Sequence, residues 1–237
     1  MDRDDRIITR LSGVGLSYAR QGGLPWKRAR FWALKDVSFD ICRGDTLGVI
    51  GRNGAGKSSL LRLIAGIMLP DAGTIERLDG IRCAMLSFGA GFEPRLTGRQ
   101  NIMLSGLQLG MSRSRIRQRE EQIVELASIG DFIDQPVRTY STGMRARLGF
   151  SIAYFIESDI LLIDEALATG DEAFRERATG LIKGKINSDQ TVVIVTHSMQ
   201  IVEKTCTRVI QIESGHSLPE QGVEETIKRY RETTILA

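Results

Sequence analysis

The stretch Gly51-Arg-Asn-Gly-Ala-Gly-Lys-Ser58 decides the fold, because it matches the phosphate-loop pattern G-x-x-x-x-G-K-[ST] at every fixed position. A short apolar run, residues 46–50, precedes it, and apolar residues at helical spacing follow it from Ser59. Strand, glycine loop and helix are the context that such a loop requires, since its amides and the helix N-terminus must converge on phosphate oxygens. The segment therefore predicts binding of a nucleoside triphosphate, and an unliganded glycine-rich turn is the alternative.

The loop also assigns the expected phosphate contacts. The Lys57 ammonium would reach the outer phosphates, and the Ser58 hydroxyl would ligate Mg²⁺. The complete set of residues expected around the phosphates is Gly51, Asn53, Gly54, Ala55, Gly56, Lys57, Ser58 and Ser59.

Composition restricts the class of protein. A chain of 237 residues is long enough for one large α/β domain, and a formal net charge of +3 is too small to indicate nucleic acid by itself. The chain has no signal-peptide run and no uncharged apolar stretch of about eighteen residues, which favours a soluble chain or a soluble subunit docked on something else. Cys42, Cys83 and Cys206 are widely separated and are expected to be buried small hydrophobes rather than metal ligands or disulfide partners.

Two strands are expected ahead of the loop, at residues 7–18 and 31–41. An aromatic side chain on one of them would supply a flat partner for an adenine ring. Tyr18 is the first choice, Phe31 and Trp32 are its rivals, and a half-buried strand tyrosine without a ligand is the alternative.

A turn-rich insertion, residues 20–30, separates these two strands. It carries Trp26 among Lys27, Arg28 and Arg30, a composition that suits anionic head groups at a membrane surface. A solvated loop is the commoner fate of such a stretch, so both interpretations stay open.

The middle of the chain turns from strands to helices. Strands are expected at residues 74–78 and 81–86, and a helical pattern runs over 99–129 with a break at Gly110 and Ser112 as a possible N-cap. Four arginines at every second position from residue 113 to residue 119 scatter round a helix axis, which favours a solvated helix over a nucleic-acid groove.

A second phosphate-binding geometry is expected at Tyr140-Ser-Thr-Gly-Met144, which opens a helical run over residues 145–156. Ser141 and Gly143 would face outward beside the positive end of that helix. Taken alone the pattern is weak, because Ser and Gly open many helices.

Two further strands end in side chains suited to phosphate chemistry. The buried-strand run 159–163 leads to Asp164, which would hold Mg²⁺ through water, and Glu165, which would polarise an attacking water. The run 191–195 delivers His197, expected to contact a γ-phosphate. Because carboxyl ends of parallel strands meet at one sheet edge, all three share a crevice with the phosphate loop.

In this order, the motifs resemble the ATPase subunit of ATP-binding cassette (ABC) transporters across essentially the whole chain. The resemblance implies ATP and Mg²⁺ as cofactors, Tyr18 as the adenine-stacking aromatic and residues 140–144 as the signature segment that caps ATP on a partner subunit. It also implies that Asp171 is a dimer-contact aspartate. The signature departs from the usual Leu-Ser-Gly-Gly-Gln at Tyr140, Thr142 and Met144, and the usual loop glutamine is absent near Phe88.

The fold class expected is α/β: a P-loop NTPase with a RecA-like parallel core, an N-terminal antiparallel β part and a helical subdomain. Residues 6–237 would form a single domain, with the β part and phosphate loop at about 6–91, the helical subdomain at about 92–157 and the C-terminal core at about 158–237. Stretches 31–39, 91–101 and 140–148 resemble the branch that exports O-antigen, capsule and teichoic acid. Longer members carry a C-terminal carbohydrate-binding domain, which we do not expect in this chain.

The expected function is ATP hydrolysis that powers export of a lipid-linked polysaccharide through a separate integral membrane permease. The subunit would be a homodimer, peripheral on the cytoplasmic face of the inner membrane, with no nucleic-acid partner. The first alternative is a soluble cassette protein acting on nucleic acid or ribosomes, or an ABC subunit for another cargo; the soluble relatives usually carry two cassettes or a long coiled coil. The second is a binding-only switch, although Lys57, Asp164, Glu165 and His197 are all present.

Overall fold

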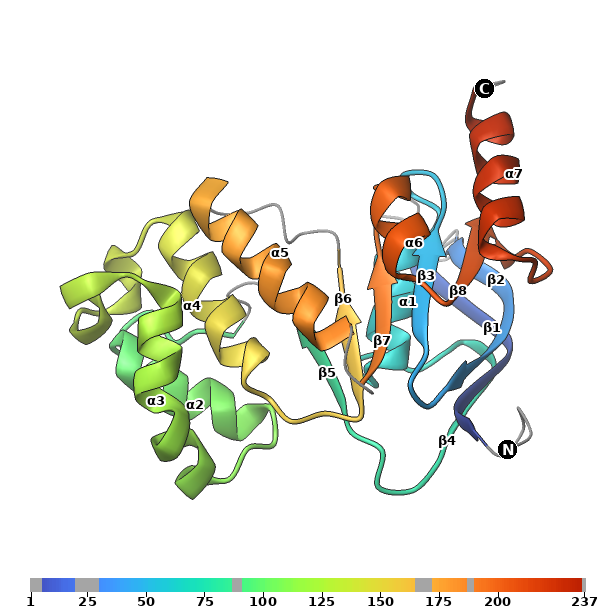
Figure 1. Cartoon of the computed structure of the whole chain (residues 1–237). Coiled ribbons are helices and arrows are strands. Elements are labelled where there is room, and N and C mark those ends of the chain that lie inside the picture. Colours follow the sequence, from blue (N-terminus) through green and yellow to red (C-terminus); the bar gives the residue numbers. More distant parts are fainter. Residues whose placement is uncertain (1–5, 20–29, 87–90, 165–171, 187–189, 236–237) are drawn as a thin grey trace.

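A mixed sheet of nine strands runs through the residues that the computed structural model describes, which are 6–19, 30–86, 91–164, 172–186 and 190–235 (Figure 1). The strand order is β4-β1-β2-β9-β8-β3-β7-β6-β5. The strands are β1 (Ile7–Ala19), β2 (Arg30–Cys42), β3 (Thr46–Ile50), β4 (Ala72–Arg77), β5 (Cys83–Leu86), β6 (Ile160–Ile163), β7 (Thr191–Val195), β8 (Arg208–Glu213) and β9 (His216–Ser217).

The two ends of this sheet differ in strand direction. β5, β6, β7, β3 and β8 are parallel to one another, whereas β4, β1 and β2 form an antiparallel part at the N-terminal end of the chain. The parallel core, the antiparallel β part and the helices confirm the predicted α/β fold class.

The parallel strands are buried on both faces, so they read as continuous apolar runs. Successive residues of β6 serve different cores: Leu161 and Ile163 pack among the buried residues under the helices, and Ile160 and Leu162 pack with β1, β2 and α1 (Lys57–Ile64). Each such aliphatic side chain contributes roughly 1.5–3 kcal/mol when it leaves water. Packing into both hydrophobic cores therefore fixes the position of the strand ends from which the candidate functional residues project.

Three helices, α2 (Gly98–Gln108), α3 (Arg113–Ala127) and α4 (Thr142–Tyr154), pack together beside β5 and form what we call the helical unit (Figure 1). Each begins at a hydroxyl N-cap, because Thr97, Ser112 and Ser141 accept a hydrogen bond from the third residue of their helix. Two short 3-10 helices, Gly130–Asp134 and Val137–Thr139, join α3 to α4. The C-terminal part of the chain adds α5 (Glu172–Ile186), α6 (Met199–Thr205) and α7 (Val223–Ile235).

Several local expectations need correction. β5 begins at Cys83 rather than at Ile81, because the Ile81 amide closes a turn onto the Leu78 carbonyl. Cys42 is buried as expected, but Cys83 and Cys206 are only partly buried. Burial raises the pKa of the Cys206 thiol to about 11.

The arginine-rich helix α3 is not uniformly solvated. Arg113 and Arg117 are exposed as predicted. Arg115 and Arg119, four residues apart and so on one face, instead turn to the end of α4, where Arg115 pairs with Glu157 and Arg119 lies over the Phe155 ring at 5.7 Å.

The insertion between β1 and β2 is described only at its last residue. Arg30, expected with Lys27 and Arg28 to meet head groups, donates to the Asp71 carboxylate at 2.7 Å. Residues 20–29, with Trp26, lie outside the described residues.

Candidate nucleotide-binding site

A cleft of about 350 Å³ opens where the phosphate loop meets the carboxyl ends of β6 and β7. Its walls come from β1, β2, the phosphate loop and the segments that follow the two parallel strands. The lining residues are Tyr18, Phe31, Ala33, Asn53, Gly54, Gly56, Lys57, Ser58, Ser59, Asp164, Val195 and His197.

The loop conformation depends on two glycines. Gly54 and Gly56 have φ angles of 79° and 96°, which L side chains rarely adopt. A Cβ at Gly56 would also lie 2.5 Å from the Ala33 carbonyl oxygen, so the loop is pressed against β2. Gly56 is the N-cap of α1, and the amides at the start of that helix therefore point into the cleft.

Lys57 lies beneath the loop with only 7% of its surface exposed. Its ammonium donates to the Gly51 carbonyl at 2.8 Å and to the Arg52 carbonyl at 2.9 Å. These carbonyls partly offset the cost of burying a charge. Both carbonyls are uncharged, so a phosphate oxygen would be a stronger acceptor for the ammonium than either of them.

Tyr18 and Phe31 form a cross-strand pair on β1 and β2 and both line the cleft. The Tyr18 hydroxyl lies 2.9 Å from the Ser59 hydroxyl, which ties the aromatic side chain to α1. Trp32 is not among the described lining residues. It points to the other face, where a Cβ on Gly15 would come within 2.9 Å of its ring. The geometry thus separates Phe31 from Trp32 and places Phe31 beside Tyr18.

Asp164 and His197 reach the same cleft as Ser58, as the sheet-edge argument predicts. No group of three His, Cys, Asp or Glu side chains in the described part of the chain would hold a metal ion. One hydroxyl and one carboxylate nevertheless fit Mg²⁺, because this ion usually keeps several waters and takes its remaining ligands from substrate phosphates. The donor set suits Mg²⁺ carried with a nucleotide.

Ser141 and Gly143 open α4 and are not among the described residues that line the cleft of their own chain. Ser141 is exposed, and its hydroxyl oxygen accepts the Met144 amide at 3.1 Å. Glu165, Asp171 and residues 87–90, where the usual loop glutamine is absent, lie outside the described residues.

One contact to the loop was missed from the sequence. The Tyr230 hydroxyl on α7 lies 3.4 Å from the Gly51 carbonyl oxygen and is separated from it by 179 residues. The amphipathic pattern of α7 indicates a packed helix, but no local signal identifies the loop as what the helix packs against.

These features define a P-loop nucleotide-binding protein. They are the glycine loop at a helix N-terminus, the buried lysine, and the hydroxyl and carboxylate at the edge of a parallel sheet. A family model described as "ABC transporter" matches residues 34–168, which is more than half of the chain. The chain belongs to the ABC transporter family and is an ATP-hydrolysing member of it.

Similar proteins agree with this assignment. The chain is 46% identical to the O-antigen export system ATP-binding protein RfbB of Klebsiella pneumoniae over 85% of this chain and 81% of that protein. It is 43% identical to the teichoic acids export ATP-binding protein TagH of Lactiplantibacillus plantarum over 85% of this chain but only 55% of that protein. In fold, a dimeric ATP-binding cassette bound to ADP and Pi matches with a TM-score of 0.73 at 23% identity, covering 91% of this chain and 99% of the other.

Among the described residues, no helix combines the length and apolar character needed to cross a membrane.

Proposed function

We propose that this chain is the ATPase subunit of a transporter that exports a lipid-linked cell-surface polysaccharide of the O-antigen, capsule or teichoic acid type. The identity of 42–46% to proteins named for O-antigen and teichoic acid export, over most of this chain, carries the proposal. A separate integral membrane permease would form the channel. The ATPase would sit at the cytoplasmic face of the inner membrane as a peripheral subunit, with no nucleic-acid partner.

Within the cleft, Lys57 binds the outer phosphates of ATP, and the Ser58 hydroxyl and the Asp164 carboxylate hold Mg²⁺. The ion neutralises charge on the phosphates when it is bound. Glu165 orients and deprotonates the attacking water, and His197 donates to the γ-phosphate. The common position of Ser58, Asp164 and His197 on one cleft supports the roles of these three side chains.

The adenine ring stacks against the aromatic wall of the cleft. Tyr18 keeps the role predicted for it, and its cross-strand neighbour Phe31 extends the same surface. Phe31 is 53% exposed, so a ligand would cover an aromatic face that now meets water.

The working unit is a head-to-tail homodimer in which each ATP is shared. The exposed start of α4, with Ser141 and Gly143, is a helix N-terminus suited to phosphate but does not face the cleft of its own chain. A second copy resolves this, because its Ser141 and Gly143 would cap the ATP held by the first. Asp171 would contact the partner at the same interface.

Light scattering tests the dimer. Glu165→Gln with ATP should form a dimer that reverts when ATP is removed, and adding Ser141→Arg should abolish it. Ser112→Arg is the matched control, because Ser112 is likewise an exposed serine N-cap that accepts an amide from its helix. A dimer that survives Ser141→Arg, or that both arginine variants abolish alike, contradicts the proposed interface.

Turnover tests the assignment of Glu165. Glu165→Gln should keep ATP affinity and lose hydrolysis by on the order of a hundredfold or more, as expected for a lost general base. Hydrolysis at the wild-type rate would remove Glu165 from the mechanism.

A further inference from the structure

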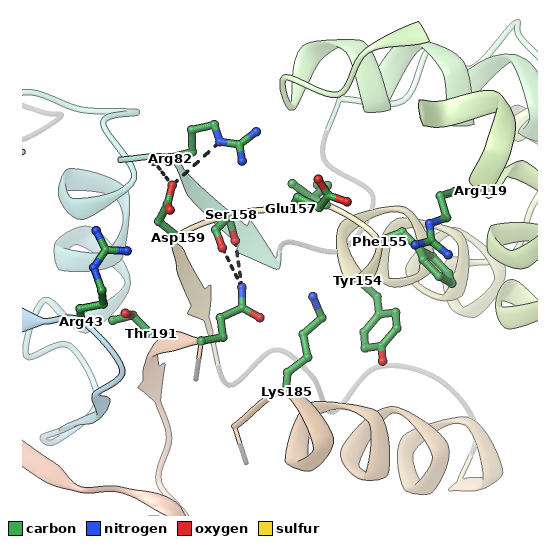
Figure 2. Close-up of a pocket in the computed structure, with 12 residues that line it drawn as sticks. Arg43, Arg82, Arg119, Tyr154, Phe155, Glu157, Ser158, Asp159, Lys185 and Thr191 are labelled. Carbon is green, nitrogen blue, oxygen red and sulfur yellow. Dashed lines mark hydrogen bonds and ion pairs between the residues drawn. The ribbon is translucent and has the colours of Figure 1, made fainter. Parts of the chain in front are cut away.

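A second pocket, of about 650 Å³, is shown in Figure 2. It lies at the opposite ends of the parallel strands from the ATP cleft. Asp159 and Thr191, at the starts of β6 and β7, line it, whereas Asp164 and His197, beyond the ends of those strands, line the cleft. We call it the basic pocket. Its residues take no part in the proposed hydrolysis.

Positive charge is concentrated around this pocket. Arg43, Arg82, Arg119 and Lys185 line it, against two carboxylates, Glu157 and Asp159. An adjoining hollow of about 210 Å³ shares Arg82 and Glu157 and adds Arg115. The two hollows together carry an excess of three positive charges, which equals the formal net charge of +3 for the whole chain. A cleft lined by one sign of charge attracts ligands of the other sign.

The two carboxylates are already engaged. Glu157 pairs with Arg115, which holds the pKa of that carboxyl below its usual range, and Asp159 lies 3.9 Å from Arg82. Neither Arg43 nor Arg119 forms an ion pair with any carboxylate in the described part of the chain. The pocket therefore retains cations that its own carboxylates do not neutralise.

Two of the cations are held in place by aromatic rings at the end of α4. The Lys185 ammonium lies 5.0 Å from the centre of the Tyr154 ring, and Arg119 lies 5.7 Å from the centre of the Phe155 ring. Burial lowers the pKa of Lys185, so an added negative charge would favour its ammonium form.

The arrangement of the cations limits the shape of the ligand. Arg43 follows β2, Arg82 precedes β5, Arg119 is on α3 and Lys185 is in the last turn of α5, and Figure 2 shows them around the pocket rather than directed at one point. A compact oxyanion needs convergent donors, whereas these suit negative charges spaced along a chain. We propose that the basic pocket binds an extended acidic peptide segment of a partner protein.

Such a segment would join two parts of the molecule. Arg119 and Tyr154 belong to the helical unit, whereas Arg43 follows strand β2 of the sheet and Lys185 is on α5. The chain from Phe155 to Asp159, which connects α4 to β6, runs along the pocket. A bound acidic segment would therefore restrain the helical unit relative to the sheet.

Fluorescence anisotropy with a labelled octaglutamate peptide and the full-length chain tests the proposal, at about 50 mM salt where surface charges are weakly screened. The wild type should bind one peptide per chain, and a labelled octaglutamine peptide should not bind. Arg43→Ala and Arg119→Ala should each weaken binding by about tenfold or more, as for a lost charge-assisted hydrogen bond. Arg117→Ala is the matched control, since Arg117 is an exposed arginine on the same helix as Arg119, and it should change affinity less than about twofold.

Three results would overturn the proposal: no binding of octaglutamate by the wild type, equal loss in Arg117→Ala and Arg119→Ala, or displacement of the peptide by inorganic pyrophosphate at an equal concentration. The last would mean a compact phosphate site. Because the assay needs neither hydrolysis nor a permease, its outcome is independent of the proposed function.

Discussion

The Tyr230 hydroxyl lies 3.4 Å from the Gly51 carbonyl oxygen, so the C-terminal helix α7 reaches the first residue of the phosphate loop. The same carbonyl accepts the Lys57 ammonium at 2.8 Å. If Lys57 turns to ATP phosphates, Tyr230 is left as the donor that keeps this carbonyl in place. We therefore expect Tyr230 to help position the loop.

Tyr230→Phe should weaken ATP binding by about twofold to fivefold, because it removes one neutral hydrogen bond worth about 0.5–1 kcal/mol. The turnover of bound ATP should stay unchanged, so the effect appears in KM and not in kcat. Tyr154→Phe is the control, since Tyr154 is also a partly buried helical tyrosine, but its ring lies against Lys185 and not against the phosphate loop. An equal change in both variants would count against the role.

Lys57→Ala should lower ATP affinity by about tenfold or more, because a charge-assisted hydrogen bond to phosphate is worth about 1.5–3 kcal/mol. Equilibrium binding of a fluorescent ATP analogue measures the change. Lys204→Ala, which removes an exposed lysine on α6, should leave affinity as it is. Wild-type affinity in Lys57→Ala would exclude this loop as the phosphate site.

The aromatic wall predicts that alanine substitutions at Tyr18 and Phe31 weaken nucleotide binding, whereas one at Trp32 does not. Tyr18→Ala and Phe31→Ala should each weaken binding by about tenfold, since stacking of a base on an aromatic ring contributes about 1–3 kcal/mol. Trp32→Ala should not, because Trp32 faces Gly15 on the other side of β2. GTP should suffer the same losses as ATP, because every base offers a flat face. Weaker binding in Trp32→Ala alone would reverse the assignment.

Asp71 predicts a pH dependence of folding. Its carboxylate accepts the Ser17 amide at 2.7 Å, the Ser17 hydroxyl at 2.9 Å and Arg30 at 2.7 Å, and these bonds, the amide first, lower its pKa from 3.8. A lowered folded-state pKa means that the stabilisation is present above the unfolded value and is lost as pH falls through the folded value. At pH 7 the wild type should therefore unfold at a higher urea concentration than Asp71→Asn. This difference in unfolding midpoint should shrink below about pH 4. A midpoint difference that grows as the pH falls would contradict stabilisation by the hydrogen bonds to the Asp71 carboxylate.

Much of the fold and site was predictable because the signals are local. The phosphate loop, its flanking strand and helix, and the carboxyl-terminal positions of Asp164 and His197 follow from periodicity and from the rule that parallel strands end at one sheet edge. The serine N-cap of α3 was likewise readable from its sequence.

The remaining features depend on distant packing. The choice between Phe31 and Trp32 depends on the register of β1 against β2, and a one-residue shift would exchange their faces. The sequence does not determine the geometry of the insertion that connects these two strands. It therefore cannot determine which residues of β1 and β2 pair. Arg119 was expected in solvent because its ring partner, Phe155, lies beyond another helix, and Tyr230 meets Gly51 only through the tertiary fold.

The most direct test of the proposed function measures surface polysaccharide in a strain from which this gene has been deleted. Deletion should remove the polymer from the cell surface, the wild-type gene should restore it, and Glu165→Gln should not, although its product still binds ATP. Surface polysaccharide at the normal level in the deletion strain, or full restoration by Glu165→Gln, would contradict the claim that ATP hydrolysis by this chain drives the export.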